Sequence, residues 1–330
     1  MENTNKSRFE RLDRFIRSQI NPNPSLFLKA KVFLDVLWER LRYDNELIDY
    51  EQYRFYFKSR PERNRFVTHG KLLEIMKVCN DPESRKIFDD KVLFNQYFKD
   101  YLGRESLDAR EASLDDISTF INKHQNVFAK DPKGMFGKGI SMLKASELDD
   151  KMLTTIKSHD YLLEEVVSQH EALAAFNPDS VNSLRVVTLR KASGEIEIMC
   201  AVQRIGRKGR VADNFHHEGI AALIDIKTGI IYTQGVDRHW NRYTLHPDSK
   251  VPIVGFKIPY WEEVKNLVLE AAQVHPEVRY VGWDVAIGPE GKLMIIEGNP
   301  GADPDVTQIP DQVGKWPNYE PLLEEIRKLG

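Results

Sequence analysis

The spacing of apolar residues changes along the chain, and this change predicts where helices give way to strands. Between residues 8 and 100, apolar positions recur at three- and four-residue intervals, as on one face of a helix. The clearest case, which we expect to be a buried face, is formed by Leu26, Ala30, Phe33, Leu34, Leu37 and Leu41. From about Leu107 onward, short apolar runs alternate with amphipathic segments, which indicates strands mixed with helices. A helical start followed by mixed and antiparallel β parts predicts the α+β class.

The segment from Tyr43 to Arg60 carries four tyrosines and two phenylalanines among charged residues. This aromatic face could stack on a nucleotide, but aromatic side chains more often pack between helices. A further helix fits Val67–Val78 and ends at the turn signal Asn80-Asp81-Pro82.

The second half of the chain predicts strands with three helices among them. The expected strands are Asn126–Lys130, Ile140–Lys144, Tyr161–Val167, Leu184–Leu189, Ile196–Gln203, Ile220–Ile226, Ile230–Gln234, Val278–Ile287 and Lys292–Glu297. The expected helices are Glu147–Ser158, Pro259–Val274 and Asn318–Leu329. We therefore predict a helical N-terminal region (1–106), a small subdomain with a glycine-rich loop (107–170) and a C-terminal subdomain with a hairpin (171–330).

Composition narrows the class of protein. Hydrophobic residues make up 41% and charged residues 29% of the 330 residues, and the formal net charge is -3. This balance is typical of a globular protein and gives no general field for nucleic acid. Cys79 and Cys200 match no zinc or disulfide pattern and are expected to be buried. The polar N-terminus and the lack of a long apolar run predict a cytoplasmic protein without a membrane span.

A predicted hairpin near the C-terminus gives the strongest chemical signal. Side chains alternate between the faces of a strand, so Glu297 and Asn299 share one face. A turn centred on Pro289-Glu290 pairs Asp284 with Ile295, which predicts that Asp284 lies on the same face, diagonal to Glu297. Two carboxylates and an amide oxygen suit a hard cation such as Mg²⁺.

The other face of this hairpin carries Trp283, Val285, Met294 and Ile296, which can pack a core. An exposed face that happens to be acidic is the alternative. This register, however, also places Leu293 and Ile295 on the acidic face, so that face is not simply solvated. Buried carboxylates would be costly without a cation, and the residues therefore favour a metal site.

A glycine-rich loop follows the strand that ends at Lys130. Gly134, Gly137 and Gly139 let backbone N–H groups approach phosphate oxygens, and Lys138 can neutralise them. The loop is neither a Walker A loop nor a dinucleotide fingerprint, and an ordinary surface hairpin explains it about as well.

Two arginines and a polar loop complete the candidate chemistry. Arg185 and Arg204 lie on or beside apolar strands, where each must find an anion, either a carboxylate or a phosphate. The loop from Asp213 to Glu218 is rich in donors and acceptors. Its adjacent histidines point apart and lack a third ligand, which argues against zinc.

Together these segments resemble the ATP-grasp superfamily, and most closely its sugar-transfer-associated branch, which is related to alpha-L-glutamate ligases. The similarity runs over roughly residues 45–330. It is carried by Asp90-Lys91, Ala129-Lys130, Gly137-Lys138-Gly139, Glu164 to Val167, Asn182 to Thr188, Asp213-Asn214, Gly282-Trp283-Asp284 and Glu297-Gly298-Asn299. Where that branch is expected to have a glycine pair after Asp-Asn, this chain has Glu218-Gly219, so its substrate is not carried over from relatives.

The resemblance implies ATP and Mg²⁺ clamped between two α+β subdomains, and it assigns a role to each matching residue. The implied ATP-binding residues are Lys91, Lys130, Lys138, Glu164, Glu165 and Val167. Arg185 and Arg204 are the implied catalytic residues, and Asp284, Glu297 and Asn299 the implied metal ligands. The implied substrate residues are Asn182, Asp213, Asn214 and His216.

The resemblance also implies a reaction. Enzymes of this class phosphorylate a carboxylate and let an amine attack the acyl phosphate, while the metal and the arginines stabilise the transferring group. The expected partners are a small-molecule or sugar-linked carboxylate and an amine, with a link to polysaccharide modification and no nucleic acid. A kinase acting on a hydroxyl group and a non-catalytic nucleotide-binding protein are the alternatives. The sequence leaves the oligomeric state open.

Overall fold

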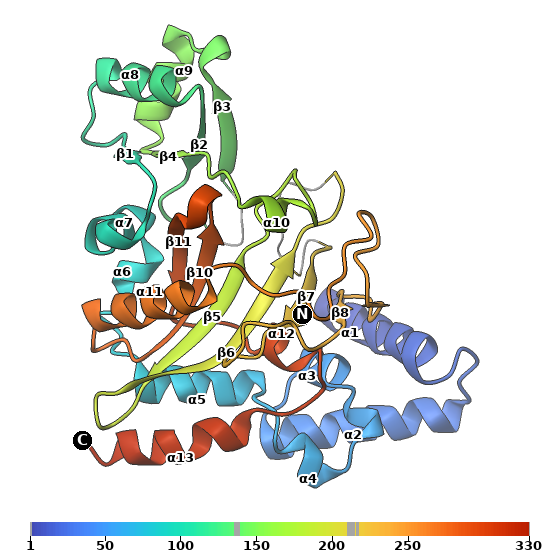
Figure 1. The fold of residues 1–330 in the computed structure, drawn as a ribbon. Helices are drawn as coiled ribbons and strands as arrows, with labels where there is room; N and C mark the ends of the chain where they lie inside the picture. The colour runs from blue at the N-terminus through green and yellow to red at the C-terminus, as the bar shows by residue number, and fades with distance from the viewer. Residues whose placement is uncertain (1, 135–138, 210–214, 216–217, 330) are drawn as a thin grey trace. The chain divides into compact units, whose positions relative to one another are not determined.

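The computed structural model describes residues 2–134, 139–209, 215 and 218–329 and divides the chain into two compact units (Figure 1). One unit joins Met1–Val78 to Asp303–Gly330, and the other is Cys79–Ala302. The described residues combine helices with two antiparallel sheets, and the first part of the chain is helical, so the predicted α+β class is confirmed. The three-part division drawn from the sequence stays a prediction. Among the described residues, no helix has the length and apolar character needed to cross a bilayer.

The first unit is built from helices around an aromatic centre. They are α1 (Glu2–Phe15), α2 (Leu26–Tyr43), α3 (Leu47–Gln52), α4 (Arg60–Arg63), α5 (His69–Cys79, which ends at the boundary between the units), α12 (Asp305–Gln308) and α13 (Trp316–Arg327). Tyr50, Tyr53 and Phe55 are buried, and the Phe55 ring contacts the rings of both tyrosines. These contacts confirm helical packing for this part of the aromatic segment.

The apolar face of α2 corrects one prediction. Leu26, Leu34 and Leu41 are exposed rather than buried. The packed side of the helix instead carries Val32 and Glu39, with Glu39 bonded to Arg63 at 2.7 Å. Apolar periodicity identifies a helix and its apolar face, but it does not say whether another element covers that face.

The second unit contains a four-stranded sheet in the order β1 (Ser106–Asp108), β4 (Leu162–Glu165), β2 (Asn126–Lys130) and β3 (Ile140–Lys144). Helices α8 (Leu114–His124) and α9 (Asp150–Ser158) pack on it through one core. Ile117 and Ile121 of α8 and Ile156 of α9 are buried in a cluster with Val127 and Leu163 of the strands. Strands β2 and β3 have the bounds predicted from the sequence.

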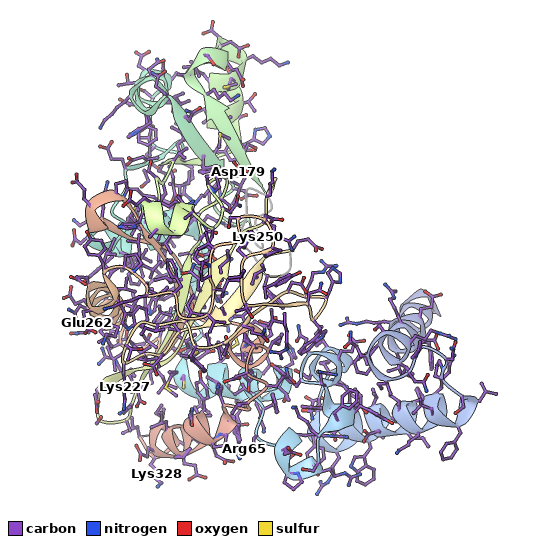
Figure 2. The ribbon with its side chains drawn as sticks, turned by 45° about the vertical axis from the view of Figure 1, so that its right-hand side comes forward. Arg65, Asp179, Lys227, Lys250, Glu262 and Lys328 are labelled. Carbon is purple, nitrogen blue, oxygen red and sulfur yellow. The ribbon has the colours of Figure 1, made fainter. Side chains whose placement is uncertain are left out.

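The larger sheet of this unit carries the predicted hairpin at one edge. Its order is β11 (Leu293–Asn299), β10 (Tyr280–Ile287), β5 (Leu184–Arg190), β6 (Ile196–Ile205), β7 (Ile220–Leu223), β8 (Gly235–Val236) and β9 (Arg242–Tyr243). Helix α11 (Trp261–Val274) packs on one face, where Val264 and Val268 meet Val186 and Trp283. Figure 2 labels Glu262, an exposed residue in the first turn of α11. The short helices are α6 (Lys86–Asp89), α7 (Lys91–Tyr97) and α10 (Glu171–Ala174).

The hairpin of β10 and β11 has a different register from the predicted one. Val285 pairs with Ile295, whereas Asp284 pairs with Glu297, because a bulge at Ile296 adds one residue to β11. The pairing of Asp284 with Ile295 was therefore wrong, and so was the placement of Leu293 and Ile295 on the acidic face. Both residues pack in or against the core that contains Val285.

Candidate ATP and metal site

A row of charged side chains crosses three strands of the larger sheet. Arg185 of β5 is the direct partner of Asp284 of β10, which is the direct partner of Glu297 of β11. On β6, Val202 opposes Arg185, and Arg204 lies two residues further along on the same face. Direct cross-strand partners project from the same face, so these four charged groups are brought together opposite the apolar core.

Two arginines hold Asp284 in place. Arg185 donates from Nε to Oδ1 at 2.5 Å and from Nη2 to Oδ2 at 3.0 Å, and Arg204 donates from Nη1 to Oδ2 at 2.7 Å. Burial alone would raise the pKa of the Asp284 carboxyl, but the two guanidinium charges outweigh it and hold this pKa well below its usual range. Asp284 is therefore ionised at neutral pH.

Glu297 has the opposite electrostatic setting. Its side chain is accessible to solvent, yet surrounding protein displaces bulk water, and this desolvation raises the pKa of the Glu297 carboxyl. The negative charge of Asp284 raises it further, and the two carboxyl groups hydrogen-bond to each other when Glu297 is protonated. Two neighbouring acids of this kind mark a position where a cation is favourable.

These groups fit a magnesium ion. Glu297 and Asp284 offer carboxylate oxygens, and Asn299 lies two residues beyond Glu297 on the same strand. Oδ1 of Asn299 accepts a hydrogen bond from the Gly301 N–H at 2.9 Å, which orients the amide. Among the described residues, no group of three or more His, Cys, Asp or Glu side chains is arranged to hold a metal ion, and the predicted donor set is two acids and an amide. Oxygen donors in this number suit Mg²⁺, which keeps water or phosphate as its other ligands.

Two predicted phosphate-binding lysines lie within the field of the acidic row. Lys91 begins α7 and donates from Nζ to the carbonyl oxygens of Asp131 and Gly134, at the start of the glycine-rich loop. Burial lowers the pKa of the Lys91 ammonium, and the charges with the largest effect on it are Glu297, which raises the pKa, and Lys130, which lowers it. The lysines and the metal-site acids of this unit therefore belong to one electrostatic cluster.

Glu164 is the centre of a buried polar network. Lys130 Nζ forms an ion pair with Glu164 Oε2, Arg104 donates to both carboxylate oxygens at 3.1 and 2.9 Å, and Asn95 Nδ2 donates to Oε1 at 3.0 Å. Burial alone would raise the pKa of Glu164, but Lys130 and Arg104 outweigh it and keep this pKa well below the usual range. The Glu164 side chain thus positions Lys130, and its backbone pairs with β1 and β2, so the predicted contact of Glu164 with ATP is not what this arrangement favours.

Arg104 is a site residue that sequence reasoning missed. Besides its bonds to Glu164, it donates to the carbonyl oxygens of Ile295 at 2.6 Å and Ile296 at 3.1 Å, on either side of the bulge in β11. It thereby links the strand of the small sheet to the strand that carries Glu297. One arginine after Gly103 gives no periodic signal, and only its burial in the fold distinguishes it from a surface arginine.

The segment after β4 leaves backbone groups available. Glu165 is held by two hydrogen bonds to the Glu105 backbone, one through its N–H at 3.0 Å and one through its carboxylate at 3.1 Å. Within the described part of the chain, the N–H and C=O groups of Val166 and Val167 have no hydrogen-bond partner. An adenine edge needs one donor and one acceptor of this kind.

The remaining predicted residues divide into two groups. Lys138, Asp213, Asn214 and His216 lie outside the described residues. Asn182 is buried, and its amide bonds to Gln169, to the Leu173 and Asn177 carbonyls and to the Gly206 N–H, which is a scaffold role. Glu218 has φ of 73°, in the left-handed region that favours glycine, at the position where the related branch was expected to have one.

The amino-acid sequence matches a known family. The model of the sugar-transfer associated ATP-grasp family matches residues 73–322, so this chain belongs to that family. Enzymes with the ATP-grasp fold are typically ATP-dependent ligases. No curated protein matches the chain in sequence.

Solved structures give distant likenesses. The ATP-grasp ligase PsnB with its minimal precursor aligns with a TM-score of 0.49 and 14% identity over 77% of this chain and 68% of that chain. PsnB with minimal precursor, Mg and ADP aligns with a TM-score of 0.48 and 15% identity over 81% of this chain and 69% of that chain. D-alanyl-alanine synthetase A from Vibrio cholerae O1 biovar eltor str. N16961 aligns with a TM-score of 0.48 and 11% identity over 75% of this chain and 68% of that chain.

Proposed function

We propose that this protein uses ATP and Mg²⁺ to join a carboxylate to an amine through an acyl phosphate. The single observation that carries the proposal is the row Arg185–Asp284–Glu297, in which direct partners on three strands bring one guanidinium and two carboxyl groups to one face. Glu297 is a solvent-accessible acid with a raised pKa, and it lies beside the ionised Asp284. An ion-pair network that only stabilises the fold does not require such an acid. The association of the family with sugar transfer supports a sugar-linked carboxylate as the substrate.

The residues divide the work in this proposal. Lys91 and Lys130 hold the α- and β-phosphates, and the free backbone groups of Val166 and Val167 hold the adenine edge. Glu297, Asp284 and Asn299 hold Mg²⁺, which when bound neutralises phosphate charge during transfer. Arg185 and Arg204 are the catalytic residues: their guanidinium groups, already directed by Asp284, stabilise charge on the phosphoryl group.

The chemistry has two balanced steps. A substrate carboxylate oxygen attacks the γ-phosphorus of ATP, the bond to the β-γ bridging oxygen breaks, and ADP leaves. The amine then attacks the acyl carbon, phosphate leaves with the bonding pair, and the amine loses a proton to give the amide. The acyl phosphate must be kept from water until the amine attacks, which demands a closed site.

The test is ADP formation with Mg²⁺ over a panel of paired carboxylates and amines. We expect ADP release that depends on both substrates and yields an amide. Glu297→Gln removes one carboxylate from the row without changing the size of the side chain, and it should abolish turnover and weaken Mg²⁺–ATP binding. Glu290→Gln alters an exposed acid in the turn of the same hairpin and should leave both unchanged.

Three results would contradict the proposal. Normal turnover by Glu297→Gln would remove the metal assignment. A stable phosphorylated product formed without an amine would identify a kinase. Tight ATP binding without turnover on any substrate pair would identify a nucleotide-binding protein. Thermal melting of both variants shows whether they are folded, so that a loss of activity can be assigned to the site.

A further inference from the structure

The exposed face of α2 has no role in the proposed reaction. This α2 apolar face consists of Leu26, Phe27, Ala30, Phe33, Leu34, Leu37, Trp38 and Leu41, all of them exposed. At 100° per residue, these positions cover roughly 140° of the helix surface. Phe27 is 80% exposed, Leu34 62% and Leu41 78%. Scattered exposed apolar side chains are ordinary, but a continuous stripe along a helix of five turns indicates a binding surface.

A second helix widens this surface. Phe9 of α1 is exposed and stacks on Phe33, with ring centroids 5.5 Å apart and planes at 23°. The indole of Trp38 is covered on one side by the Arg60 guanidinium, 4.9 Å from its ring. An aromatic ring beside a cation is suited to a boundary between apolar and polar surroundings.

Basic residues border the α2 apolar face on both sides. On the helix surface, Lys29 and Arg40 lie along one edge and Lys31 and Arg42 along the other. Lys29 pairs with Asp13 at 2.5 Å, and Arg40 with Glu46 at 2.5 Å. Lys31 and Arg42 make no ion pair with any described residue.

The acidic residues of α2 are on its other side. Asp35 and Glu39 are the two acids of the helix, and both accept hydrogen bonds from Arg63 on the packed side, at 2.9 and 2.7 Å. The four charges that α2 itself contributes next to the apolar face are therefore positive, although the formal net charge of the whole chain is -3. At the Lys29 and Arg40 edge they are paired with Asp13, Asp44 and Glu46. The positive charge is local to this helix.

We propose that the α2 apolar face docks this protein on a membrane surface that contains anionic lipids, with α2 lying in the plane of the interface. A wide apolar stripe between two basic edges is the pattern of interfacial helices, because the stripe enters the acyl boundary and the basic edges meet the anionic headgroups. A second copy of the chain fits less well. Antiparallel pairing of two such faces brings the Lys31 and Arg42 edges of both copies together, which places like charges next to each other.

Vesicle flotation of the full-length protein tests this proposal. The wild type should float with vesicles of phosphatidylcholine and phosphatidylglycerol in equal parts and should bind vesicles of phosphatidylcholine alone more weakly. Raising the salt concentration should weaken the binding, because screening acts on exposed charges. Leu34→Glu with Leu41→Glu should reduce the partition coefficient by about tenfold for each leucine removed from the lipid. Leu329→Glu, at an exposed leucine outside the face, is the matched control and should bind normally.

The charged edges are tested separately. Lys31→Glu with Arg42→Glu should weaken binding to the anionic vesicles several-fold and leave thermal stability unchanged. Failure of the wild type to float, or unchanged flotation of the Leu34→Glu, Leu41→Glu variant, would refute the proposal. A dimer in sedimentation that this variant dissolves would show that a second copy covers the face. A marked loss of thermal stability in the variant would show that another part of the chain covers it. Because flotation needs no nucleotide, it is independent of the proposed ligase activity.

Discussion

Replacing Arg104 by methionine should destabilise the protein strongly, although the proposed function gives Arg104 no contact with ATP or Mg²⁺. Its side chain is 1% exposed and bonds to both oxygens of Glu164 and to the carbonyls of Leu102, Ile295 and Ile296. Methionine fills much of the same volume but supplies no donor. The variant leaves a buried carboxylate with fewer partners and carbonyl oxygens without this donor.

The size of the effect follows from burial. Removing one member of a buried ion pair costs about 3–5 kcal/mol, because the other charge stays away from water. Lys130 still faces Glu164, which places the expected loss near the lower end, at about 3 kcal/mol. Urea unfolding followed by tryptophan fluorescence measures it. Arg110→Met is the matched control, since Arg110 is 32% exposed beside Asp108 and its pair should contribute at most about 1 kcal/mol.

A double variant separates charge from packing. Glu164→Gln removes the carboxylate that Arg104→Met leaves behind, so the two together should cost less than the sum of the single losses by about 1–3 kcal/mol. Additive losses, or a loss for Arg104→Met no larger than that for Arg110→Met, would refute the view that Arg104 neutralises Glu164.

Three further predictions concern the same unit. Lys130→Met should weaken ATP binding about tenfold in a calorimetric titration, since it removes the charged phosphate contact that we propose for Lys130, and normal affinity would contradict this role. The pKa of Glu164 is lowered on folding, so the stability that its charge contributes is complete above the unfolded pKa of about 4.3 and is lost as pH falls below it. The urea concentration at the unfolding midpoint of the wild type should therefore decrease as the pH is lowered from about 5 to 3. The midpoint of Glu164→Gln should decrease less over the same range. A Cβ on Gly282 would lie 2.4 Å from Cβ of Ala302, so Gly282→Ala should cost about 1–3 kcal/mol in the same assay, whereas Gly70→Ala, with its nearest neighbour at 3.4 Å, should be almost neutral.

The sequence predicted the elements of the fold better than their pairing. The sequence predicted that Asp284 and Glu297 share one face, but it did so through a pairing of Asp284 with Ile295 that the structure does not have, because the bulge at Ile296 leaves no trace in the apolar pattern. Because side chains in a strand have a period of two, this one extra residue moved Leu293 and Ile295 to the core side.

Two other features depend on long-range packing. The pairing of Arg185 and Arg204 with Asp284 joins residues 99 and 80 positions apart, and the sequence could say only that each arginine needed an anion. Leu34 and Leu41 are exposed because Arg63 bonds to Glu39 on the opposite side of α2 and that side packs against the protein. The local sequence does not indicate which side of the helix packs.

Strand β11 has one consequence for heat tolerance. It stands at the end of the seven-stranded order, so its seven residues, Glu297 included, have β10 as their single strand neighbour. Peripheral strands fray at lower temperature than interior ones, because they have one ladder of hydrogen bonds to lose instead of two. Arg104 fastens this strand from the other side through two carbonyls. Because Glu297 lies on this strand, detachment of β11 on heating would separate Glu297 from Asp284 before the rest of the sheet unfolds.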